Sequence, residues 1–195
     1  MKKITLSFLM VLALMHSVSA LDIIRDGKIC IAPVTGENAA APERFASDEF
    51  SRILQKMANP ALPEKSEPAS RLVIGTPSTN SGIAEKSDFL GLNRDDLKKR
   101  DSFVIRTVGN DIYAASNTPS GAMFAVFELL EKLGVRWFFP SEDGEFIPVL
   151  KNRNLSIDEI NIVSVPDFEF RTLSAHYQRE KYIFLQHIKT TASSP

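Results

Sequence analysis

The stretch from Gly109 to Pro140, GNDIYAASNTPSGAMFAVFELLEKLGVRWFFP, decides the fold of this chain. It opens on Gly109-Asn110-Asp111, a turn-forming cluster that lies between two runs rich in β-branched residues, 102–108 and 111–116. Two such runs around a short turn are typical of a β-hairpin. We therefore expect two antiparallel strands here.

The same stretch predicts the most apolar helix of the chain. Thr118 is suited to be its N-cap, Pro119 to be its first residue, and Gly134 to end it. A helix this apolar is expected to be buried on more than one side. The run Val135–Pro140 follows and is expected to be a strand with aromatic residues on both faces. The apolar stripe of the helix consists of Ala122, Val126, Leu129, Leu130 and Leu133.

Strand and helix signals alternate through the rest of the chain. Short apolar runs predict strands at Ile29–Pro33 and Arg71–Thr76, and helical spacing of apolar residues predicts a helix from Ala41 to Met57. A short helix is expected within Asn93–Arg100 and a final strand within Asn154–Val163. This order predicts an α+β fold, an α/β sandwich in which a mixed β-sheet is covered by helices.

Composition limits the possible functions. The 195 residues are 44% hydrophobic and 24% charged, with 23 basic and 24 acidic side chains. This balance is that of a globular protein and excludes a strongly basic nucleic-acid binder. The single cysteine excludes an internal disulfide framework and a cysteine-rich zinc site. A (β/α)₈ barrel needs about 250 residues, so none is expected in this chain.

The first twenty residues have the pattern of a signal peptide. Lys2 and Lys3 precede the apolar run Ile4–Met15, and small residues lead up to Ala20. We expect cleavage between Ala20 and Leu21 and export to the periplasm or the outside of the cell. The apolar run is shorter than the roughly 20 residues that span a bilayer, so no stable membrane anchor is expected.

An acidic turn after Trp137 is the main candidate for chemistry. Glu142, Asp143 and Glu145 lie close together there, and paired carboxylates beside aromatic rings are typical of glycosidases. Carboxylates so close in sequence seldom face each other across a sugar ring. Trp137 and these three acidic residues are therefore candidates for a substrate rim or for a face toward a neighbouring domain. The simpler alternative is that the turn is only solvated and binds nothing.

Other reactive side chains are few. Cys30 lies in an apolar run that favours a buried strand thiol, and His176 and His187 are too far apart for a helical metal pair. Asn117–Gly121 could present backbone N–H groups to an anion, although simple helix capping is the ordinary interpretation. No catalytic residue, metal or cofactor is expected in the chain.

The stretch from Gly109 to Pro140 resembles a recurrent block of glycoside hydrolases. It is similar to the N-terminal domain of family 67 α-glucuronidases and related exported polysaccharide-degrading proteins, whose fold is similar to domain 2 of family 20 β-hexosaminidases. Ser116 differs, since the family commonly has glycine there. The resemblance covers about residues 22–171 and is carried by Thr118, Pro119, Gly121, Leu133, Gly134, Arg136, Trp137 and Pro140.

The resemblance implies a division of the chain into three parts. Residues 1–20 are the signal peptide, 21–165 a non-catalytic accessory domain, and 166–195 the lead-in to a catalytic (β/α)₈ barrel that supplies the catalytic carboxylates. The chain would then be a truncated product of a glycoside hydrolase, and carbohydrate would be a partner through the full-length enzyme. Xylan or a related glycan is the substrate class implied.

Two alternatives to an accessory domain stay open. The chain could be an independent exported carbohydrate-binding module that uses Trp137 and the acidic turn. It could also be a small exported enzyme of an unrelated class, built around Cys30 or His176.

Overall fold

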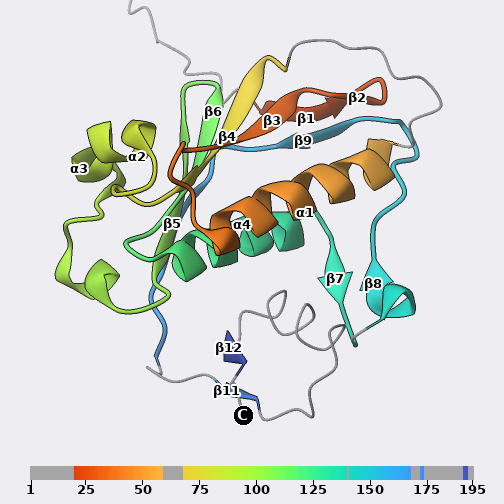
Figure 1. Cartoon of the computed structure of the whole chain (residues 1–195). Coiled ribbons are helices and arrows are strands. Elements are labelled where there is room, and N and C mark those ends of the chain that lie inside the picture. The colour runs from red at the N-terminus through yellow and green to blue at the C-terminus, as the bar shows by residue number, and fades with distance from the viewer. Residues whose placement is uncertain (1–19, 59–67, 140, 168–171, 174–190, 193–195) are drawn as a thin grey trace, which may run out of the picture.

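A five-stranded mixed sheet forms the centre of the fold. The computed structural model describes residues 20–58, 68–139, 141–167, 172–173 and 191–192 (Figure 1). The order of the strands is β10-β5-β6-β4-β3, in which β3, β4 and β6 are parallel and β5 is antiparallel to both of its neighbours. The strands are β3 (Ile31–Thr35), β4 (Ser70–Gly75), β5 (Phe103–Val108), β6 (Asp111–Ala115) and β10 (Asn161–Ser164).

Helices cover both faces of this sheet. The long helices α1 (Ala41–Ala58) and α4 (Pro119–Lys132) contact each other on one face (Figure 1). The short helices α2 (Ser81–Glu85) and α3 (Ser87–Leu90) and the 3₁₀ turn η1 (Asp95–Lys98) lie on the other. Side chains alternate between the two layers along each strand: Leu72 and Ile74 lie in the α1–α4 core, and Val73 lies in the second core. The predicted α/β sandwich is therefore confirmed.

The predicted hairpin and apolar helix are both present. Val108 and Asp111 are opposite each other across the β5–β6 turn, and Gly109 between them has a φ of 62°. Thr118 is the N-cap of α4, and its hydroxyl accepts a hydrogen bond from the Gly121 amide at 3.2 Å. Gly134 follows the helix with a φ of 97°, a conformation that favours glycine.

The strand expected over Val135–Pro140 is much shorter than predicted. Only β7 (Arg136–Trp137) forms, and it pairs with β8 (Glu145–Phe146) in a separate two-stranded sheet. The 3₁₀ turn η2 (Glu142–Gly144) brings the chain back so soon that the Phe138 amide donates to the Gly144 carbonyl at 2.9 Å. The expectation of a strand that continues to Pro140 is thus wrong, because η2 turns the chain back after Trp137 and the hairpin does not join the central sheet.

A third sheet lies at one end of the fold. It has the order β2-β1-β9, with β1 (Leu21–Arg25), β2 (Lys28–Ile29) and β9 (Leu155–Ile157). The single strand expected over Asn154–Val163 is in fact two, β9 and β10, in different sheets. β1 was not expected, although Ile23 and Ile24 are fully buried. A short parallel pair, β11 (Thr172–Leu173) and β12 (Thr191–Ala192), completes the described elements.

The boundaries expected for the signal peptide and the accessory domain stay predictions. β1 begins at Leu21, the residue after the expected cleavage site, and β10 ends at Ser164. Within the described part of the chain, no helix is long and apolar enough to cross a membrane.

Candidate functional site

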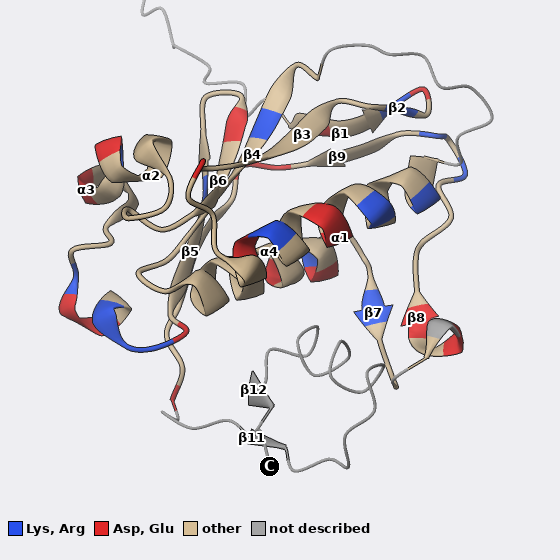
Figure 2. Ribbon diagram, in the orientation of Figure 1, with Lys and Arg blue, Asp and Glu red and all other residues tan. Residues whose placement is uncertain are grey.

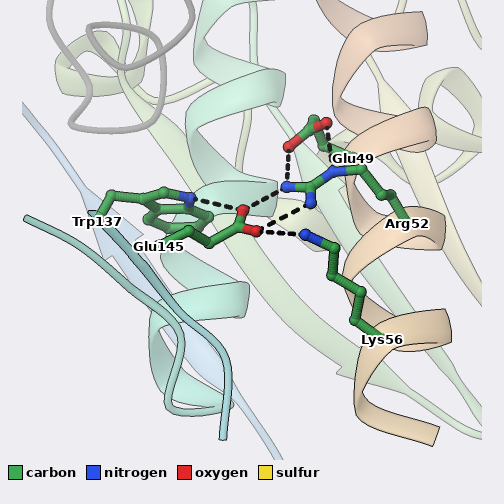
Figure 3. A network of polar contacts seen from close by, with 5 residues as sticks. All are labelled: Glu49, Arg52, Lys56, Trp137 and Glu145. Carbon is green, nitrogen blue, oxygen red and sulfur yellow. Dashed lines mark hydrogen bonds and ion pairs between the residues drawn. The ribbon is translucent and has the colours of Figure 1, made fainter. Parts of the chain in front are cut away.

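A network of ion pairs and hydrogen bonds is centred on Glu145. This residue lies on β8 and its carboxylate points toward α1 (Figure 3). It accepts hydrogen bonds from two nitrogens of Arg52, one of them at 2.9 Å, and from Lys56 Nζ at 2.9 Å. The Trp137 indole N–H donates to the same carboxylate at 3.3 Å. The side chain of Glu145 is only 10% exposed.

The charges of this network balance locally. Arg52 also donates from Nε and Nη2 to the carboxylate of Glu49, both at 2.9 Å, so one guanidinium lies between two carboxylates. Burial alone would raise the pKa of Glu145, but the hydrogen bonds and charges of Arg52 and Lys56 outweigh it and lower that pKa to about 2. The hydrogen bond with Glu145 in turn raises the pKa of Arg52 above its ordinary value. Basic and acidic residues both occur along α1, so the helix carries charges of both signs (Figure 2).

Trp137 anchors the β7–β8 hairpin to the helices. Its ring meets Phe127 of α4 edge to face, with ring centroids 5.9 Å apart, and Phe127 meets Phe45 of α1 in the same way at 6.1 Å. Trp137 and Glu145 are therefore brought together, and both hold the hairpin against α1 and α4.

The other two residues of the acidic turn lie on η2. The side chain of Asp143 is exposed, whereas that of Glu142 lies outside what the structure describes. The alternative that the acidic turn is only solvated thus fits Asp143, whereas Glu145 is bound by Arg52 and Lys56. A carboxylate with a pKa of about 2 that is bound by two cations does not hold a proton near neutral pH, so Glu145 is unsuited to general acid catalysis.

Sequence reasoning missed the cations of this network. Arg52 and Lys56 lie 93 and 89 positions from Glu145. The available signal was local: Glu49, Arg52 and Lys56 recur at spacings of three and four, which places them on one side of α1. That pattern is typical of any solvated helix face and does not identify a partner.

The other sequence candidates have structural roles or lie outside the described residues. Cys30 lies between β2 and β3 and is half-buried, so the expectation of a buried strand thiol is wrong; the thiol donates to the Lys28 carbonyl at 3.5 Å. At the start of α4 the Thr118 hydroxyl accepts from the Gly121 amide, so the capping interpretation holds, and the Asn117 amide donates to the carbonyls of Leu92 and Leu97 at 2.8 and 3.0 Å. His176 and His187 lie outside the described residues. Among the residues that are described, no group of three or more acidic, histidine or cysteine side chains could hold a metal.

The β7–β8 hairpin also exposes large apolar side chains. Phe138 is 68% exposed, Phe139 50% and Phe146 53%. We call these three residues the hairpin aromatic face. Exposed aromatic rings on a hairpin that is itself anchored to the core are typical of a protein–protein contact.

Comparison with known proteins gives little. No family model matches the chain, and no curated protein matches it. Among solved structures, that of CpGH84B matches over 81% of this chain with a TM-score of 0.43 and 14% identity. The match covers 22% of that structure's chain, so this chain spans about a fifth of its length. A similarity of this size assigns no activity.

Proposed function

We propose that the chain is an exported, non-catalytic accessory domain of an α-glucuronidase-like glycoside hydrolase that acts on xylan or a related glycan. The observation that carries this proposal concerns the stretch from Gly109 to Pro140, by which the sequence resembles that family. We call this stretch the block. Its described members are used in folding. Thr118 caps α4, Arg136 donates to the Glu131 carbonyl at 2.6 Å, and Trp137 packs on Phe127.

Gly121, another residue of the block, also has a role in folding. A Cβ atom at this position would lie 2.7 Å from the carbonyl oxygen of Ser102, so only glycine lets α4 approach the start of β5 this closely. These described residues of the block therefore build a scaffold. A scaffold of this kind supports an accessory role better than a catalytic one.

The hairpin aromatic face is the surface that we propose for docking on a catalytic (β/α)₈ barrel. Aromatic side chains are enriched at the centres of interfaces, where they contribute much of the binding energy. The ion pairs of Glu145 and the packing of Trp137 fix the hairpin before any partner binds. Such preorganisation lowers the entropy lost on association.

An activity assay tests this proposal. The purified protein is expected to match the blank on aryl glucuronides, aryl hexosaminides and xylan fragments. Reproducible turnover that a substitution within this chain abolishes would overturn the accessory role in favour of a small enzyme.

The docking surface has a test of its own. We expect the isolated chain to self-associate in sedimentation velocity, and replacement of the hairpin aromatic face by three serines to make it monomeric at unchanged thermal stability. The matched control is Phe89→Ser, since Phe89 is 59% exposed but lies on α3. Equal association of both variants would contradict docking through the hairpin.

A further inference from the structure

We infer that a cleft, which runs over the sheet face at β3, β4 and β6 to the carboxyl ends of β3 and β4, binds a neutral oligosaccharide. The cleft has a volume of about 810 Å³. Its floor is a row of three side chains, Val34, Val73 and Tyr113, which the register aligns across β3, β4 and β6. The choice of a sugar as the ligand rests partly on the proposed function, whereas the location of the cleft does not.

The position and size of the cleft are those of a ligand site. Parallel sheets bind ligands just beyond the carboxyl ends of their strands, because the loops that follow neighbouring strands meet there. The walls here are the last residue of β3 with the segment 36–38 after it, the loop 77–80 after β4, and residues of α2 with Lys86 directly after it. Sites for small molecules commonly enclose about 300–1,000 Å³.

Buried hydrogen bonds fix the loops around the cleft. Asn80 is 7% exposed; its amide donates to the Ile74 carbonyl at 3.0 Å and its oxygen accepts from the Gly82 amide at 3.0 Å. The Thr79 hydroxyl donates to Glu43, a fully buried carboxylate, at 2.6 Å. A Cβ atom on Gly36 would lie 2.7 Å from the Asn80 Cα, so the two loops touch and close one end of the cleft. The cleft is thus formed before a ligand arrives.

The chemistry of the walls favours a neutral polyhydroxylated ligand. Glu37 and Glu85 supply negatively charged acceptors to the cleft, and Lys86 supplies a positively charged donor. The hydroxyls of Ser78 and Ser81 can both donate and accept hydrogen bonds. The guanidinium of Arg71 is held by Asp111 at 2.6 Å, so its charge is already matched. The two carboxylates outnumber the one unmatched ammonium group, so an anionic ligand would be repelled, whereas the hydroxyls of a neutral ligand can donate to the carboxylates and accept from Lys86.

The floor supplies the complementary apolar contact. Val34 is 38% exposed and can contact the C–H groups of a sugar ring, whereas Val73 and Tyr113 are only 5% and 4% exposed and support the floor from below. The hydroxyls at the edge of the ring meet the polar walls. Lys86 Nζ lies 5.9 Å from the centre of the Tyr113 ring, which places a donor above that end of the floor.

An NMR titration tests the cleft. Xylotetraose and cellotetraose serve as neutral probes and glucuronic acid as the charged one, each added at millimolar concentration to the ¹⁵N-labelled protein. We expect a neutral probe to shift the amides of Gly36, Ser78 and Gly82. No shift with either neutral probe, stronger shifts with glucuronic acid, or shifts confined to the β7–β8 hairpin would each overturn the inference.

Two tryptophan variants locate the binding. Ala84 is an exposed residue of α2 that lines the cleft, so Ala84→Trp should fill it and weaken binding at least tenfold. Ala69→Trp is the matched control, since Ala69 is exposed just before β4, at the opposite end of that strand, and this variant should bind as the unchanged protein does. Unweakened binding by Ala84→Trp would overturn the inference. Hydrolysis of glycosides by the chain would instead overturn the accessory role and leave the cleft result intact.

Discussion

The ion pairs of Glu145 predict how the stability of the domain depends on pH. Arg52 and Lys56 lower the pKa of this carboxyl from 4.5 to about 2 in the folded state. A group whose pKa is lower in the folded than in the unfolded chain stabilises the fold above its unfolded pKa. Ionised Glu145 is therefore expected to stabilise the fold above about pH 4.5, and this contribution is lost as the pH falls toward 2.

The structure also sets the size of the effect. At about 1.4 kcal/mol per pKa unit, the difference between 4.5 and 2 gives an upper limit of about 3 kcal/mol. The side chains of Arg52 and Lys56 are 36% and 49% exposed, so solvent screens their attraction for Glu145. We expect a net contribution of about 1–2 kcal/mol at pH 7.

Urea denaturation of Glu145→Gln at pH 7 and pH 3 measures this contribution. The variant should be less stable by about 1–2 kcal/mol at pH 7, and the difference should fall to less than half of that at pH 3. Asp143→Asn, an exposed change on the same turn, is the matched control and should stay within about 0.5 kcal/mol of the unchanged protein. Equal stability of Glu145→Gln and the unchanged protein at pH 7, or a difference that keeps its full size at pH 3, would refute the reasoning.

Three further predictions address export and packing. N-terminal sequencing of the protein from cells should begin at Leu21, and a cytoplasmic product that keeps Met1 would contradict export. Thermal denaturation should show losses below about 1 kcal/mol for Phe138→Ala, which removes an exposed ring, but about 3–5 kcal/mol for Phe127→Ala in the core; similar losses for the two would contradict the exposure of the hairpin. Gly121→Ala should destabilise the fold by about 1–3 kcal/mol because its Cβ meets backbone at 2.7 Å, and an unchanged melting temperature would show that α4 can move away.

The elements that the sequence predicted well are those with local signals. The β5–β6 hairpin has its turn at Gly109, and α4 has its cap at Thr118 and its end at Gly134, so each boundary can be read within a few residues. β1 was missed although its turn has a local signal, since Asp26 and Gly27, with φ values of 53° and 79°, join β1 to β2 in a hairpin. Its other partner, β9, lies about 130 positions away, and no local pattern predicts that pairing.

The β7–β8 hairpin shows why the candidate site was only half predictable. The aromatic run after Gly134 has the composition of a buried strand, but η2 returns the chain so quickly that only Arg136 and Trp137 pair. The sequence drew attention to the acidic turn, and its suggested role as a substrate rim or a face toward a neighbouring domain stays a prediction. Its structural role depends on Arg52 and Lys56, which only the packing of α1 beside the hairpin brings to Glu145.

Sequencing the gene and its transcript past codon 195 tests the central claim most directly. If this chain is the accessory domain of a glycoside hydrolase, the sequence that follows should encode a (β/α)₈ barrel with a pair of catalytic carboxylates, in the same frame or in a shifted one. Unrelated coding sequence or intergenic DNA at that point would contradict the claim.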